Sequence, residues 1–317
     1  MFCFILAIVA LLVSLCSSSF SPKDLLSAPR ASAAIPNPNG TLAAYSQTTY
    51  SFDTDSRSGG IYLLPIATKS SPKLIINDTN ASDPVWLDNH TVLYIYTKSG
   101  ESSLRTYDVQ TDDDQSIHEF HGQIGDLKAL IHRNRSIRIA FSAKVTPAGD
   151  ILRANETGTP DVLVYDRLWV RHWDEWITDT KQSIFSTCIN RSNGAYSLVQ
   201  NPINMLNSSR DLHDLESPIP PFGGAGDFSL SETHLAFVSK DPHLNPATNT
   251  AAHVYVVRFN DSSLHEQVHR GSGASSSPVW SPDGKYLAYL EMRVAGYEAD
   301  RPLMFGRTND RPSGGLV

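Results

Sequence analysis

Short apolar stretches recur along the chain at a nearly constant interval, and each ends in an aromatic residue. Tyr45, Tyr94, Phe141, Phe237 and Tyr289 mark five copies, which follow one another at spacings of 49, 47, 96 and 52 residues. A period of roughly 40 to 50 residues built from short strands is typical of β-propeller blades. The spacing of 96 residues corresponds either to two units or to one unit with a large insertion.

The clearest copy is Ser277–Arg293. Pro282–Gly284 predicts a tight turn, because proline presets φ and glycine accepts a positive φ. The near-continuous apolar run Tyr286–Leu290 predicts a strand that is covered on both faces. The same kind of turn precedes the first copy at Pro38–Gly40, so the repeat includes turns as well as strands.

A second series of apolar stretches follows the markers, and each member precedes a polar turn. Its members are Ile61–Ile66, Leu104–Val109, Ile184–Ile189 and Val254–Phe259. A unit therefore consists of a marker strand, a second strand, a turn, an outer strand and the lead-in to the next unit.

These repeats predict an all-β fold, a β-propeller with four blades and part of a fifth in an incomplete ring. We expect the blades at about residues 34–80, 81–130, 131–221 and 222–275, and a fifth that begins at Ser276 and does not finish. The chain divides accordingly into a signal peptide at 1–19, a partial propeller domain at 20–305 and a non-matching tail at 306–317.

The third unit carries an anomaly between its marker strand and its second strand. A polar loop is followed by the predicted strand Val162–Tyr165 and by an unusual run, RLWVRHWDEW, at 167–176. Two interpretations of this run stay open. It is either a hairpin that packs its aromatic side chains on the neighbouring blade, or an excursion toward a cavity that presents Arg171, Asp174 or Glu175 to a peptide terminus or a second domain.

The N-terminal segment Phe2–Leu15 is almost purely apolar, and Ser17–Ser19 follow it. A run of about 14 residues is short for a membrane span, and the small residues after it are typical of a secretory signal peptide. A buried core helix is the alternative. We therefore expect a secreted, extracellular protein with no membrane partner, which starts with a short helix near Pro22 that ends before Pro29.

Nine N-x-Ser/Thr sequons lie in stretches that the pattern assigns to turns or loops. Behind a signal peptide, this number predicts a secreted glycoprotein. Asn39 lies within a tight turn and is the least favourable acceptor, and Asn77 and Asn80 are close enough to compete. The eight expected acceptors are Asn77, Asn80, Asn89, Asn134, Asn155, Asn190, Asn207 and Asn260.

Composition changes this picture little. Apolar residues make up 40% of the chain, which is enough for a sizeable core, and the formal net charge of −7 comes without a basic stripe, so nucleic acid is not an expected partner. Cys3 and Cys16 fall in the signal peptide, so no internal disulfide framework is predicted. Cys188 is expected to be a small buried residue of a strand, with a free thiol as the alternative.

His265–His269 matches the HExxH pattern of zinc metalloproteases. That chemistry needs a helix, which places the two histidines one turn apart on one face. The segment occupies the place of an outer strand, where residues four apart lie roughly 13 Å apart and cannot share one zinc ion. His118–His121, at the equivalent place of the second unit, is interpreted in the same way.

A serine nucleophile commonly lies in a sharp strand-to-helix turn of the pattern G-x-S-x-G. The sequence holds no such match, and GSGASSS at 271–277 is interpreted as a linker between blades. The residues themselves therefore assign no catalytic side chain, no metal ligand and no cofactor.

Three quoted segments resemble one known family. SPVWSPDGKYLAYLEMRVAGYEADR, RLWVRHWDEW and FSPKDLLSAPRASAAIPNPNG look like the secreted fungal dipeptidyl peptidases V, a branch of the prolyl oligopeptidase family of serine peptidases. The resemblance covers about residues 20–301. It implies an N-terminal β-propeller followed by an α/β-hydrolase domain with a Ser, Asp and His triad, and the removal of N-terminal dipeptides from peptides with free N-termini.

The sequence departs from the family pattern because it stops inside the propeller and has no position that matches a triad residue. We therefore expect the truncated propeller part of such a peptidase, without the α/β-hydrolase domain and inactive by itself, so whether the chain is an enzyme stays open. The alternative is a secreted propeller-type binding module, which a complete ring of blades would favour.

Overall fold

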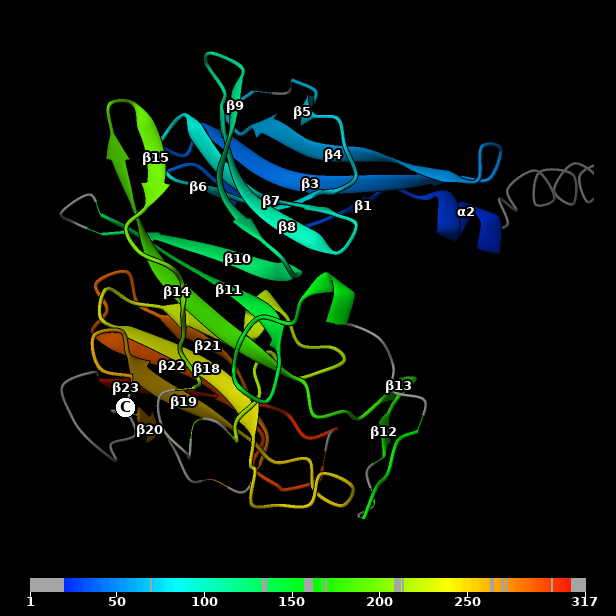
Figure 1. The fold of residues 1–317 in the computed structure, drawn as a ribbon, viewed down its shortest axis with the longest axis vertical. Coiled ribbons are helices and arrows are strands. Elements are labelled where there is room, and N and C mark those ends of the chain that lie inside the picture. Colours follow the sequence, from blue (N-terminus) through cyan, green and yellow to red (C-terminus); the bar gives the residue numbers. More distant parts are fainter. Residues whose placement is uncertain are drawn as a thin grey trace, which may run out of the picture.

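The computed structural model describes residues 20–68, 70–132, 136–156, 162–166, 168, 170–207, 212, 214–262, 265–268, 271, 273–297 and 299–308. The predicted signal peptide, the tail from residue 309 and the sequon Asn134 lie outside these residues. Five antiparallel sheets follow one another along the chain, and a small two-stranded hairpin lies apart from them (Figure 1).

The first two sheets are the first two blades. The predicted short helix is confirmed as α2 (Pro22–Ser27), which starts with a capping box between Ser21 and Asp24. The first sheet contains β1 (Arg30–Ala31), β2 (Ile35–Pro36), β3 (Leu42–Ser51), β4 (Ser56–Pro65) and β5 (Lys73–Ile76). The second sheet contains β6 (Ala81–Trp86), β7 (Thr91–Lys98), β8 (Glu101–Asp108) and β9 (Asp113–Phe120).

The remaining sheets continue the series. The third contains β10 (Ile124–Ile131), β11 (Ile137–Val145), β14 (Lys181–Ser192), β15 (Ala195–Leu198) and β16 (Ile203–Asn204). The fourth contains β17 (Phe228–Leu230), β18 (His234–Lys240), β19 (Ala252–Arg258) and β20 (His265–Gln267). The fifth contains β21 (Ser275–Trp280), β22 (Tyr286–Glu291) and β23 (Leu303–Thr308), so β23 continues past the predicted boundary at residue 305.

This arrangement confirms the predicted β-propeller class, with four blades and a three-stranded fifth among the residues that the structure describes. The spacing of 96 residues is therefore one blade with a large insertion. Both series of predicted strands are confirmed, because every marker and every member of the second series lies in a strand of its blade.

Two further predictions were wrong, the start of blade three and one strand of its insertion. Blade three begins with β10 at Ile124 instead of near Ile131, because a bulge at Asp126, with φ at 56°, interrupts the alternation that marks a strand. Val162–Tyr165 is not a strand. No neighbouring strand pairs with it, and Val162 and Val164 remain 73% and 88% exposed.

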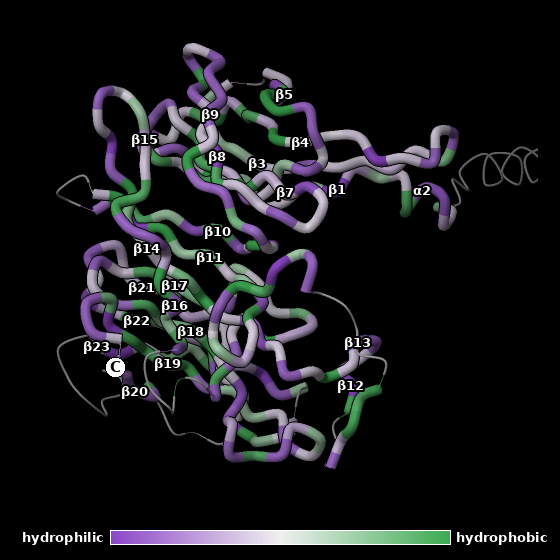
Figure 2. Tube along the Cα trace, viewed as in Figure 1, coloured by the Kyte–Doolittle hydropathy of each residue, from purple (hydrophilic) through white to green (hydrophobic). Residues whose placement is uncertain are grey.

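The apolar core lies between blades instead of within one. Its largest cluster joins blades two and three, with Leu93 and Leu104 on one side and Ile139, Phe141 and Phe185 on the other. Further clusters join blades three and four, four and five, and one and two. Figure 2 shows the apolar residues running through the strands of the blades, and again along a segment beside β12 (Arg171–His172).

Because neighbouring strands are antiparallel, their connections gather at two opposite faces of the propeller. The turn face carries the short first connection of each blade, for example at Ser231 and Gly284, where a Cβ added to Gly284 would lie 3.5 Å from the Ser231 Cβ. The loop face carries the connections between second and third strands, at 52–55, 99–100, 146–180, 241–251 and 292–302.

Candidate functional site on the loop face

Large apolar side chains are exposed mainly on the loop face. Three lie at the turn face, namely Ile66, Ile131 and Tyr286. Six more lie in or next to strands β2, β5, β15, β16, β21 and β23, namely Ile35, Leu74, Val199, Ile203, Val279 and Met304. Those on the loop face are Phe20, Leu25, Leu26, Phe52, Val162, Val164, Leu168, Trp173, Trp176, Phe222, Leu244, Val294 and Tyr297. Patches of this kind commonly mark surfaces that contact a partner or a ligand, so the loop face is the candidate functional surface.

The insertion of blade three forms the hairpin predicted as one alternative. β12 pairs with β13 (Glu175–Trp176), and Trp173 occupies the turn with φ at 56°. The rings of Trp173 and Phe222 meet edge to face at 5.5 Å, and the Arg171 guanidinium lies 5.8 Å from the centre of the Trp176 ring. Trp173 and Trp176 nevertheless remain 71% and 53% exposed, so these two side chains are not packed into a neighbouring blade.

The three residues singled out in the hairpin do not share one environment. Asp174, Glu175 and Trp176 line a hollow of about 980 Å³, and Arg171 is exposed but does not line it. Carboxylates predominate among the charged groups of this hollow, and valine, leucine and tryptophan side chains supply its apolar wall. The other lining residues are Lys144, Leu152, Glu156, Val162, Leu163, Val164, Tyr165, Ile177, Thr178, Asp179 and Thr180.

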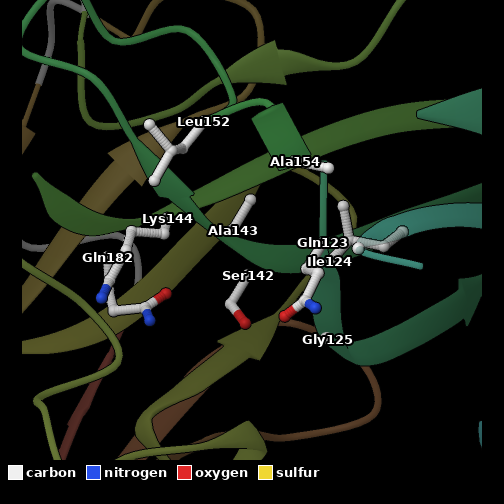
Figure 3. Close-up of a pocket in the computed structure, with 10 residues that line it drawn as sticks. Gln123, Ile124, Gly125, Ser142, Ala143, Lys144, Leu152, Ala154 and Gln182 are labelled. Carbon is white, nitrogen blue, oxygen red and sulfur yellow. The ribbon is translucent and has the colours of Figure 1, made fainter. Parts of the chain in front are cut away.

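A second hollow, of about 550 Å³, lies beside the first and shares Lys144 and Leu152 with it. In Figure 3, Lys144 and Gln182 lie on one side of this hollow, Gln123 lies on the other, and Ser142 lies between them. The Ser142 hydroxyl donates to Asp126 Oδ2 at 2.6 Å. The two hollows therefore adjoin on the loop face, and together they are called the trough.

The sequence did not indicate Gln123, Lys144 or Gln182. Lys144 and Gln182 face each other across the β11–β14 ladder, and Gln123 reaches the hollow from the connection before β10. Lys144 and Gln182 become neighbours only when β11 and β14 pair, and the long insertion separates these two strands in the sequence. The sequence pattern alone therefore does not mark these residues as a site.

The buried carboxylate of Glu216 binds the backbone of a residue that lines the trough. Glu216 Oε1 accepts a hydrogen bond from the Gln182 backbone N–H at 2.8 Å. Burial raises the pKa of Glu216, while that hydrogen bond and the positive charges of Lys181, Lys144 and Lys240 oppose the rise. The charges of three lysines thus act on one buried acid, and Lys144 is the one of the three that lines the two hollows.

The outer-strand interpretation of the HExxH segment is confirmed. His265–Gln267 form β20, which pairs with β19, and His118 lies in β9. The second histidine of the motif, His269, lies outside the described residues. Within the described part of the chain, no group of three His, Cys, Asp or Glu side chains is placed to hold a metal ion.

Most expected glycan acceptors are exposed. Asn89 is half-buried, and its Oδ1 is buried without a hydrogen-bond partner. Asn190 lies in β14 and not in the predicted turn, because the β14–β15 hairpin extends to blade two, where the Tyr196 hydroxyl donates to Asp88 Oδ2 at 2.8 Å. The exposed acceptors are Asn77, Asn80, Asn155, Asn190, Asn207 and Asn260.

Two further expectations concern the strands and the membrane. Cys188 is free and only half-buried in β14, where it lies opposite Arg138. None of the helices in the described ranges has the length and apolar character needed to span a membrane.

Blades packed face to face, with a lined trough on one face, place the protein in the class of β-propellers. No family model matches the sequence. Two solved structures resemble the fold at a distance. One is from a study of two prolyl endopeptidases (14% identity, TM-score 0.49, 91% of this chain and 34% of that chain). The other is the β-propeller domain of the Trilobed protease from Pyrococcus furiosus (10% identity, TM-score 0.40, 89% and 82%).

Curated proteins confirm the resemblance inferred from the sequence. The chain is 32% identical over 289 residues to a dipeptidyl-peptidase 5 of Schizosaccharomyces pombe, covering 90% of this chain and 40% of that protein. It is also 32% identical over 307 residues to a dipeptidyl-peptidase 5 of Aspergillus fumigatus, covering 90% and 42%. The chain therefore spans about two fifths of the length of these relatives.

Proposed function

We propose that this chain is the propeller part of a secreted dipeptidyl peptidase, and that its loop face receives both peptides and the catalytic part of the enzyme. The observation that supports this most directly is that exposed Val162, Val164 and Trp176 line the larger of two adjoining hollows on the loop face. The similarity to dipeptidyl-peptidases 5 supplies the substrate class.

The chain by itself is proposed to bind peptides without cleaving them. Covalent catalysis needs an activated nucleophile and an oxyanion hole. The sequence has no G-x-S-x-G elbow, and it matches only about two fifths of the relatives' length. The remaining part of such an enzyme supplies the triad in this proposal, and the propeller limits which peptides reach it.

The hairpin is proposed to meet the peptide's N-terminus. Asp174 and Glu175 line the acidic hollow, and a peptide ammonium is attracted to such carboxylates. Trp176 forms an aromatic wall of the same hollow, against which an apolar side chain can pack. Arg171 lies outside the hollow and is better placed to meet the catalytic part.

Titration calorimetry of the purified chain tests this function. We expect short peptides with free N-termini to bind more tightly than their N-acetylated forms, and we expect no hydrolysis of dipeptide chromogenic substrates. Trp173→Ala combined with Trp176→Ala should weaken binding, and Tyr286→Ala on the turn face is the matched control. Labelling by a fluorophosphonate probe would contradict the inactive state, and equal binding of acetylated peptides would contradict the role of the hairpin.

Secretion and glycosylation complete the proposal. Exposed sequons and the apolar N-terminal segment support passage through the secretory pathway. Expression in a eukaryotic host should yield a protein whose apparent mass falls on endoglycosidase treatment. Asn260→Gln should remove one glycan, whereas Asn89→Gln should change nothing, because Asn89 is half-buried. An unchanged mass after the enzyme treatment argues against secretion.

A further inference from the structure

The smaller hollow differs from the acidic one in the charge of its lining. Lys144 is its one charged lining residue, and Gln123, Gln182 and Ser142 are its polar ones. The side-chain ends of Gln123, Gln182 and Lys144 make no hydrogen bond to another group in the described part of the chain, although the charge of Lys144 also acts on buried Glu216. These three side chains therefore present free donors and acceptors to whatever enters.

Each of these groups suits one part of a peptide. A glutamine amide offers one donor and one acceptor side by side, which matches the N–H and C=O of a peptide group. A lysine ammonium binds a carboxylate as a point charge. The Ser142 hydroxyl donates its hydrogen bond to Asp126, so the hydroxyl oxygen remains an acceptor for a peptide N–H.

The charges along the trough run from negative to positive. The larger hollow has Glu156, Asp174, Glu175 and Asp179 in its lining, and Lys144 lies where it adjoins the smaller hollow, which has no carboxylate in its lining. A short zwitterionic peptide also has two oppositely charged ends, an ammonium and a carboxylate. It lies most favourably with its ammonium toward the hairpin and its carboxylate toward Lys144.

We propose that the hollow of about 550 Å³ is a subsite for the C-terminal end of a short peptide. Lys144 pairs with the terminal carboxylate, and Gln123 and Gln182 bind the adjoining peptide groups. This assignment rests on the proposed peptide binding at the loop face and adds a direction to it. Short peptides with a free C-terminus are therefore favoured over amidated peptides of the same sequence.

The test compares tetra-alanine with its C-terminal amide by titration calorimetry on the purified chain at low ionic strength. We expect the free acid to bind about two- to fivefold more tightly, the range of a solvent-exposed ion pair, and we expect added salt to shrink the difference. Lys144→Gln should make the two peptides equal. Lys98→Gln, an exposed lysine at the end of β7 outside the hollow, should keep the preference.

Gln182→Ala should weaken both peptides by a similar factor, because it removes a contact to the peptide chain and not to the carboxylate. Circular dichroism and thermal unfolding of the variants check that the fold is kept. Equal binding of the acid and the amide by the unchanged chain would overturn the subsite while leaving peptide binding intact. Loss of the preference in Lys98→Gln as well would assign it to general surface charge, and absence of all binding would reject both proposals.

Discussion

The strands of blade three and the insertion that connects them contain the same kinds of side chain in opposite environments. Phe141 on β11 is fully buried, stacks on Phe185 at 5.8 Å and meets Phe120 edge to face at 5.2 Å. In the insertion, Trp173 and Trp176 are 71% and 53% exposed. A blade buries its aromatics because the next blade covers them. The insertion extends beyond that cover, so its aromatics are available to a partner.

The largest effect on stability should come from the buried strands of blade three. Phe141→Ala leaves a cavity between blades two and three, and we expect it to lower the free energy of unfolding by about 3–5 kcal/mol. Urea denaturation followed by circular dichroism measures the change. A loss below about 1 kcal/mol would show that the two blades do not form one cooperative core.

The blades could be predicted because burial and pattern coincide in them. Each marker aromatic ends an apolar stretch, and the fully buried Tyr94, Phe141 and Phe237 show why that stretch recurs. Pattern fails where a strand bulges, as at Asp126, and where an apolar stretch finds no neighbour, as at Val162–Tyr165. Strand propensity needs a pairing partner, and sequence pattern alone does not supply one.

The candidate site could be predicted only in part. Arg171, Asp174 and Glu175 stood out because charged and aromatic residues crowd one short segment, and two of them do line a hollow. Gln123, Lys144 and Gln182 come from three separate segments and carry no motif. The folded register of β11 and β14 brings Lys144 and Gln182 together, and the chain before β10 places Gln123 at the same hollow.

Blades two and three also meet through a polar contact between their inner strands, in addition to the buried aromatic side chains. Asp83 Oδ2 accepts a hydrogen bond from the Asp126 backbone N–H at 3.0 Å. Burial and then the Asp126 carboxylate raise the pKa of Asp83 above its ordinary value of 3.8, although backbone N–H groups oppose the rise. Burial also raises the pKa of Asp227, which lies near Asp126 and Lys128.

We expect this contact to make blade packing depend on pH. The folded chain holds the Asp83 proton more tightly than the unfolded chain does. The resulting stability is fully present below the ordinary aspartate pKa, and it is lost as the pH rises through the raised value. Asp83→Asn should therefore flatten the fall in the free energy of unfolding that sets in as the pH rises above the ordinary aspartate pKa of 3.8.

The control for this prediction is Asp53→Asn, which changes an exposed aspartate of the β3–β4 turn. Urea denaturation across the pH series compares the three proteins. The difference between Asp83→Asn and the unchanged chain is the informative quantity, because other carboxylates add slopes of their own. An identical slope in both would mean that Asp83 does not couple protonation to the contact between the blades.

The smallest effect on stability should come from the exposed insertion of blade three. Trp176→Ala removes an exposed ring, and the Arg171 guanidinium lies 5.8 Å from the centre of that ring. Because such an exposed contact stabilises a fold little, we expect the free energy of unfolding to change by less than about 1 kcal/mol. The same change removes an aromatic wall of the acidic hollow and should weaken peptide binding. Calorimetry and urea denaturation on one protein sample separate the two quantities. A destabilisation as large as that of Phe141→Ala would show that the hairpin belongs to the core of the blade, and the loop face would then lose its role as the contact surface.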